Sequence, residues 1–168
     1  MSSDSIAYAK PTLNQYSVAV TVGLNGFEGF ANYTNTFDEY RIQKVEYTLE
    51  NIVDTSSTAL IPVGYLCVDR NDVTYPTKNF MMANKATKSK MLNNGDKLSI
   101  TWKPNLLNST AATGVYTNMF DQWVPTAYNQ TAYYGLKIFI DNFKETIGGV
   151  RVSAKAWIQF RGNSRAFQ

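Results

Sequence analysis

Hydrophobic and polar residues alternate along several stretches of the chain, which is the pattern of a half-buried β-strand. The clearest examples are residues 16–22, 97–102, 134–143 and 150–161. Segments rich in glycine, asparagine and aspartate separate these stretches and indicate turns and loops. The pattern therefore predicts an all-β protein.

Residues 37–49, FDEYRIQKVEYTL, form a long strand-like segment whose alternation changes phase in the middle. Tyr40 and Ile42 share one phase, whereas Val45 and Tyr47 share the other. One extra residue between the two halves would produce this slip, because a β-bulge opposes two residues to one and bends the strand. We expect a bulge there, in a strand that curves around the core.

The remaining segments are less regular. Residues 23–35 hold three glycines and indicate a loop, and residues 104–121 are also predicted to be mostly loop. Residues 79–92 could form one short helix, and residues 121–128 a short strand. The last two strands would pair if the turn between them made a hairpin, and they could equally lie in different sheets.

A chain of 168 residues has the length of one domain. Eight strands of uneven length joined by long loops favour a single eight-stranded jelly roll, an antiparallel sandwich, with at most one short helix. We expect residues 1–14 to be a short flexible arm, residues 15–162 to be the jelly roll, and residues 163–168 to be a tail.

The composition excludes several kinds of chemistry. The chain has no histidine, which excludes a histidine-based triad, a histidine general base and a histidine-ligated metal. Its one cysteine, Cys67, lies in an apolar run and is predicted to be a buried, unreactive thiol. The phosphate-binding glycine loops are absent too. We expect no enzyme activity, no cofactor and no metal. The carboxylates that could serve a glycosidase are scattered: Asp38, Glu39, Glu46, Asp69, Asp72 and Asp141.

The first thirteen residues lack both the basic and the apolar region of a signal peptide. No apolar run approaches the roughly 18 residues of a membrane span. From these two observations we expect a soluble intracellular product with no membrane insertion.

The polar side of residues 150–161 carries an unusual set of side chains. Arg151, Lys155, Trp157 and Arg161 alternate onto one face of the predicted strand. Cations beside an aromatic ring can bind phosphates and stack a base. They can also anchor a contact with another subunit, or simply form a solvated surface. The residues leave these three interpretations open.

Aromatic residues also occupy predicted loops, where a monomer would expose them to water. They favour either contacts between subunits or, in a monomeric carbohydrate-binding jelly roll, a platform that stacks sugars. With Trp157, the candidate interface aromatics are Tyr33, Phe120, Trp123, Tyr128 and Tyr133.

Four segments resemble those of circovirus capsid proteins, in the same order along the chain. They are FDEYRIQKVEYTL, WKPNLL, YYGLKIFIDNF and VRVSAKAWIQFRG, and the similarity spans roughly residues 16–162. The segments are moderately specific together and weak singly.

The resemblance implies a capsid protein of a virus with a circular single-stranded DNA genome. It implies a jelly roll that assembles with copies of itself into a small icosahedral (T=1) shell of sixty subunits, whose inner face meets DNA. The protein would belong to the virion and would assemble in the nucleus or cytoplasm of the host cell. Arg41 and Lys44 match basic positions of the family's strand motif and are candidate inner-surface contacts.

One feature departs from that family, whose members usually begin with a long arginine-rich arm. The first fourteen residues here hold a single cation, Lys10. Neutralising phosphates requires many such charges, so we expect weak DNA binding. A removed arm, a relative that packages DNA by other means, and a shell that assembles empty all remain open.

Overall fold

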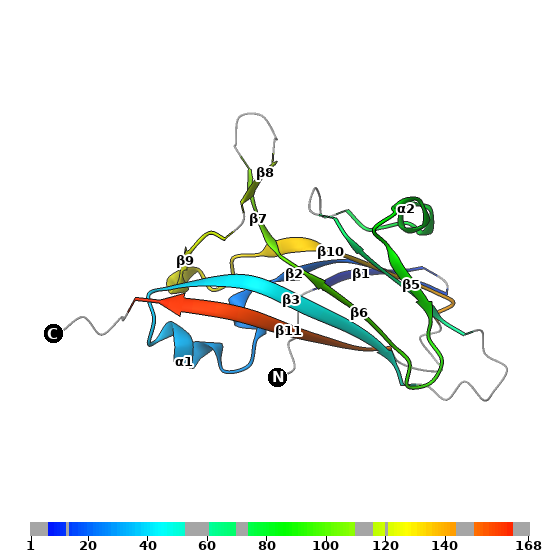
Figure 1. Ribbon diagram of the computed structural model, residues 1–168, viewed down its shortest axis with the longest axis horizontal. Coiled ribbons are helices and arrows are strands. Elements are labelled where there is room, and N and C mark those ends of the chain that lie inside the picture. Colours follow the sequence, from blue (N-terminus) through cyan, green and yellow to red (C-terminus); the bar gives the residue numbers. More distant parts are fainter. Residues whose placement is uncertain are drawn as a thin grey trace.

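Two antiparallel β-sheets form a sandwich around one main core in the computed structural model (Figure 1). Sheet A has the order β1 (Ala7–Thr12), β2 (Gln15–Val22), β10 (Tyr133–Asp141), β4 (Val63–Val68) and β5 (Lys88–Met91). It is extended by β7 (Asn105–Ser109), which pairs with β10, and by β8 (Tyr116–Met119), which pairs with β7. Sheet B has the order β11 (Val150–Arg161), β3 (Glu39–Asn51) and β6 (Lys97–Trp102), with β9 (Val124–Pro125) on β3. The structure describes residues 7–12, 14–52, 61–69, 74–109, 116–119, 121–143 and 150–162.

The core between the sheets is filled from alternate positions of the strands, as the sequence pattern predicts. Burying each such aliphatic or aromatic side chain contributes on the order of 1.5–3 kcal/mol. Its buried members include Val18, Val20, Val22, Tyr40, Ile42, Val45, Tyr47, Leu49, Leu98, Ile100, Leu136, Ile138 and Ile140.

The predicted β-bulge in the long strand β3 is confirmed. Trp157 lies opposite Lys44, and the next residue of β11, Ile158, lies opposite Ile42. Gln43 is therefore the extra residue. Because of it, the core-facing positions change from Tyr40 and Ile42 to Val45 and Tyr47.

The two C-terminal strands lie in different sheets, which settles the alternative that the sequence left open. β10 is a central strand of sheet A, between β2 and β4. β11 pairs with β3 in sheet B.

The described residues contain eleven strands, more than the eight predicted. Residues 7–12, expected to belong to a flexible arm, form β1 and pair with β2. Part of the expected loop 104–121 forms the β7–β8 hairpin, which stands away from the sandwich in Figure 1. These strands are short, so their alternation is too brief to stand out before the partner strand is known. Residues 1–6 and the tail 163–168 lie outside the described residues.

The prediction of at most one short helix is wrong, because the described residues contain two α-helices. One is α2 (Lys78–Ala83), at the start of the expected helical segment 79–92, whose later residues 88–91 form β5 instead. The other is α1 (Phe30–Thr34), inside the predicted glycine-rich loop. Gly29 has φ of 78° and makes the turn that glycine permits, after which one helical turn follows. Two single 3₁₀ turns also occur, η1 (Leu24–Gly26) and η2 (Thr126–Tyr128).

Helix α2 covers the outer face of sheet A. The side chain of Thr77 caps it by accepting a hydrogen bond from the backbone N–H of Phe80. Met81 of α2 packs with Cys67 and Phe139 of the sheet in a second, smaller core. The central strands of sheet A are therefore covered on both sides.

Candidate nucleic-acid interface

The outward side chains of sheet B form one face that carries cations and aromatic rings. In β11, Ala154 and Ala156 pack into or against the core. The side chains of Arg151, Lys155 and Arg161 alternate with the inward positions and are exposed. We call this surface the cationic face, and it comprises Arg41, Lys44, Trp123, Arg151, Lys155, Trp157 and Arg161.

The bulge in β3 explains how Arg41 and Lys44 come to share this face. They are three positions apart, so strict alternation would send them to opposite sides of the sheet. The extra residue Gln43 removes the conflict. Arg41 then pairs with Gln159 of β11, whose side-chain oxygen accepts a hydrogen bond of 2.8 Å from the Arg41 Nε.

Two lysine ammonium groups lie close to the ring of Trp157. The Nζ of Lys44 is 3.8 Å from the centre of the indole ring, and the Nζ of Lys155 is 4.9 Å from it. Both distances are within the range of cation–π attraction. Glu46 lies opposite Lys155 in the strand register and brings one carboxylate to this part of the face.

Trp123 makes a second cluster of the same kind. It precedes β9, which pairs with Glu39 and Tyr40 of β3. The guanidinium carbons of Arg41 and Arg161 lie 4.7 Å and 4.3 Å from the centre of its ring. The sequence pattern predicts Trp123 as a loop aromatic, because only the pairing of β9 with β3 brings it to the cations.

Carboxylates offset part of this positive charge. Glu39 forms an ion pair with Arg161, and Glu50 lies 3.8 Å from Arg151 and 3.3 Å from Lys97. The cations of these pairs are more than half exposed, and such surface pairs contribute only about 0–1 kcal/mol. They are therefore weak enough for an anion to compete for the cations.

The chemistry of the cationic face is suited to binding a nucleic acid. Guanidinium and ammonium groups can contact phosphate oxygens, and the indole rings can stack on bases. Because the two tryptophans alternate with cations along the sheet, the face combines both kinds of contact that single-stranded nucleic acid offers.

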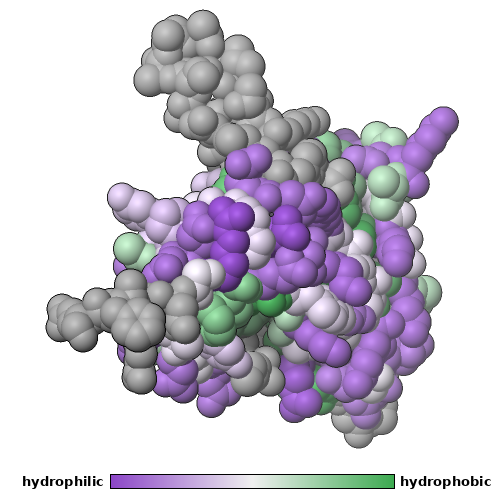
Figure 2. Space-filling view, turned by 60° about the vertical axis from the view of Figure 1, so that its left-hand side comes forward, coloured by the Kyte–Doolittle hydropathy of each residue, from purple (hydrophilic) through white to green (hydrophobic). Residues whose placement is uncertain are grey.

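The other candidate interface aromatics differ in their exposure to solvent. Tyr128 is 66% exposed and Tyr33 is 43% exposed. Tyr133 was expected in an exposed loop, and that prediction is wrong. It is only 3% exposed and belongs to the core in β10, where it lies beside Tyr40. Phe120 lies outside the described residues. Figure 2 shows a largely hydrophilic face on which hydrophobic side chains gather in a few places.

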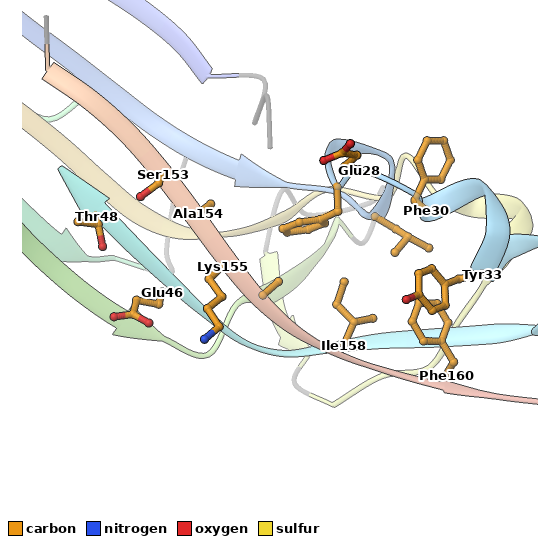
Figure 3. Close-up of a pocket in the computed structure, with 13 residues that line it drawn as sticks. Glu28, Phe30, Tyr33, Glu46, Thr48, Ser153, Ala154, Lys155, Ile158 and Phe160 are labelled. Carbon is orange, nitrogen blue, oxygen red and sulfur yellow. The ribbon is translucent and has the colours of Figure 1, made fainter. Parts of the chain in front are cut away.

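Tyr33 also borders a groove beside β11, shown in Figure 3. The groove has a volume of about 710 Å³ and lies between β11 and the segment of η1 and α1. Tyr33 stacks on Phe160 at its end, with the ring centres 4.9 Å apart. Its lining comprises Leu24, Phe27, Glu28, Phe30, Tyr33, Glu46, Thr48, Ser153, Ala154, Lys155, Ala156, Ile158 and Phe160.

Lys137 is a buried cation that the alternation of its strand does not reveal. It alternates with the core residues Leu136 and Ile138, yet it is only 2% exposed. Its Nζ lies 3.2 Å from a carboxylate oxygen of Asp69 and donates a 3.3 Å hydrogen bond to Thr74, over the ring of Phe80. Phe139, two positions later on the same side, was the available signal that this side is covered too.

Cys67 is buried, as predicted, and burial raises the pKa of its thiol, which suits an unreactive structural cysteine. Among the described residues, no group of three histidine, cysteine, aspartate or glutamate side chains could hold a metal ion. Within the same residues, no helix is long and apolar enough to cross a membrane.

Comparison with solved structures gives distant likenesses to viral proteins. A chain of Tobacco necrosis virus has a TM-score of 0.55 at 9% identity, with 96% of each chain covered. A chain of Red clover necrotic mosaic virus has a TM-score of 0.52 at 16% identity, covering 82% of this chain and 43% of that one. This chain thus spans less than half of the latter protein. A T=1 subviral particle of a Penaeus vannamei nodavirus capsid deletion mutant gives a TM-score of 0.45 at 9% identity, over 85% and 80% of the two chains.

At such identities the first two likenesses show a shared jelly-roll fold, and the third carries no weight. No curated protein matches the chain. The family model for the circovirus capsid protein, however, matches residues 2–164, which is nearly the whole sequence. The chain therefore belongs to the circovirus capsid protein family, and it is a structural component of a virion rather than an enzyme.

Proposed function

We propose that sixty copies of this protein assemble into a small icosahedral (T=1) shell around single-stranded DNA, with the cationic face of sheet B turned toward the DNA. Membership of the capsid family supports self-assembly. The exposed rings of Tyr33 and Tyr128 supply apolar surface for contacts between subunits.

The observation that carries the DNA assignment is the pair of cation–aromatic clusters, Lys44–Trp157–Lys155 and Arg41–Trp123–Arg161. Single-stranded DNA leaves its bases free to stack, and its phosphates attract the neighbouring cations. A duplex would hide the faces of its bases from the indole rings. The arrangement therefore favours single strands.

If DNA is enclosed, the positive charge on the folded domain contributes to the attraction. Each shell subunit would contribute one such face, so a modest charge per subunit would be multiplied around the inner surface.

The salt dependence of binding tests the assignment. We expect the double variant Lys44→Gln/Lys155→Gln to bind a fluorescent oligothymidine more weakly than the wild type, measured by anisotropy. Loss of two phosphate contacts should also lower the slope of log K against log salt by about 1.4, since each contact on a single strand contributes roughly 0.7.

The matched control is Lys85→Gln/Lys88→Gln, which removes the same charge from two exposed positions, Lys85 between α2 and β5 and Lys88 at the start of β5. We expect this variant to keep most of the wild-type slope. Equal losses in both double variants would mean that the attraction is only the net charge, and the assignment of DNA to the cationic face would then be wrong.

A further inference from the structure

Among the described residues, β11 is the longest strand at an edge of either sheet. On sheet A, the edge strand β5 is four residues long and carries Lys88 and Lys90, and β1 is six residues long and contains Pro11. On sheet B, β6 contacts β4 and β5, which closes that end of the sandwich. β11 is twelve residues long and pairs with β3 on one side. Short strands, lysines and proline are the usual devices that prevent strand edges from pairing.

The groove runs along this edge of β11. Ala154 and Ile158 line it from the inward face of the strand, and Ser153 and Lys155 line it from the outward face. Because the lining includes both faces of this edge strand, the hollow reaches around the edge of β11 that does not pair with β3. Figure 3 shows these residues following the strand past the segment that bears Glu28.

We propose that this edge pairs antiparallel with the β11 edge of a second copy of the chain, across a two-fold axis centred on Ala154. The inference rests on the proposed self-assembly. An icosahedral shell contains two-fold axes, and a two-fold contact brings the same element of each copy together. The result is one continuous sheet of β6, β3 and β11 from each of two copies.

Charge excludes several registers, and the Ala154 register is one that it allows. Directly opposite residues of an antiparallel strand pair have their side chains on the same face of the sheet. The two-fold axis must therefore lie between the two copies of one residue, which faces itself. An axis at Ser153 would place Arg151 opposite Lys155, and an axis at position 155 would place Lys155 opposite itself. Like charges directly opposite each other destabilise a sheet. An axis at Ala154 places Arg151 opposite Trp157 and Lys155 opposite Ser153, so no cation faces a cation.

The apolar side chains fit the same register. Val152 points toward the groove side of β11 and is 40% exposed in the monomer. In the pair it lies opposite Ala156 of the second copy, a small residue that leaves room for it. Val150 lies opposite Ile158, near the aromatic end of the groove where Tyr33 stacks on Phe160. The second copy thus buries Val152 and fills the groove.

The pairing has a consequence for the cationic face. The outward side of β11 belongs to that face, so two faces join across the axis into one surface. A single strand of DNA could then pass from the Trp157 of one copy to the Trp157 of the other without leaving the sheet.

Cysteine cross-linking in assembled particles tests the pairing. Two Ala154→Cys residues would face each other on the axis, and mild oxidation should convert the larger part of the chain to a disulfide-linked dimer on a non-reducing gel. The native Cys67 is buried, so the wild type should stay monomeric on the gel. The control Gln159→Cys should also stay monomeric, because two such residues would lie about 34 Å apart at 3.4 Å per residue.

If Ala154→Cys fails to fold, a mixture of the Val152→Cys and Ala156→Cys variants gives the same test, since these positions face each other in the proposed register. Particles that form normally but show no cross-link at either set of positions would overturn the pairing and leave the shell standing. Cross-linking of Gln159→Cys as fast as Ala154→Cys would also overturn it. Failure of the wild type to form particles would refute the shell, and the pairing with it.

Discussion

Replacing Asp69 by alanine should lower the free energy of unfolding by about 3–5 kcal/mol, because it leaves the buried ammonium of Lys137 without its carboxylate. Lys137 is only 2% exposed beneath α2, and its Nζ lies 3.2 Å from Asp69. A loss of this size is a large part of the 5–15 kcal/mol that stabilises a typical domain. Urea denaturation followed by circular dichroism measures it.

Two further variants isolate the cause. The double variant Asp69→Ala/Lys137→Met should be more stable than Asp69→Ala alone, because methionine removes the buried charge and keeps the volume. Lys78→Ala breaks another Lys–Asp pair on α2, with Asp141, whose lysine is 44% exposed. This control should cost much less than Asp69→Ala, because ion pairs of exposed lysines contribute little to stability. A double variant less stable than the single one would contradict the explanation.

Replacing Tyr40 by alanine should also cost about 3–5 kcal/mol, the usual effect of removing a large buried aromatic side chain. Tyr40 is fully buried between the sheets, and burial raises the pKa of its hydroxyl to about 12. The hydroxyl donates a 3.2 Å hydrogen bond to the carbonyl of Tyr128. Through this bond and the pairing of β9, Tyr40 holds the segment that follows Trp123 against β3.

Conservative and exposed replacements set the scale for this second prediction. Tyr40→Phe keeps the ring and loses one hydrogen bond, so it should cost about 1 kcal/mol. Tyr128→Ala removes an exposed ring and should change stability by about 0.5 kcal/mol or less. Equal losses in Tyr40→Ala and Tyr128→Ala would contradict the assignment of Tyr40 to the core.

The features that could be predicted from the sequence are those that depend only on the alternation of polar and apolar residues within one long strand. The phase slip between Ile42 and Val45 predicted a bulge because β3 is long enough to show both phases, and the pairing with β11 places it at Gln43. Alternation in β11 likewise placed Arg151, Lys155 and Arg161 on one face. Neither required knowledge of the partner strand.

Features that depend on distant segments could not be predicted in this way. Alternation alone would place Lys137 at the surface, because it does not show that α2 covers that side of sheet A. Tyr133 lies at the beginning of β10, and only pairing with β2 and β7 shows that it is buried. Trp123 joins the cations solely through β9. In each case the environment comes from residues far away in the chain.

Negative-stain electron microscopy of the purified wild-type protein at high concentration tests the central claim, that this chain builds a shell. We predict uniform, round particles whose size is the same from one preparation to the next. A field of single small subunits, unchanged across salt concentration and pH, would contradict self-assembly.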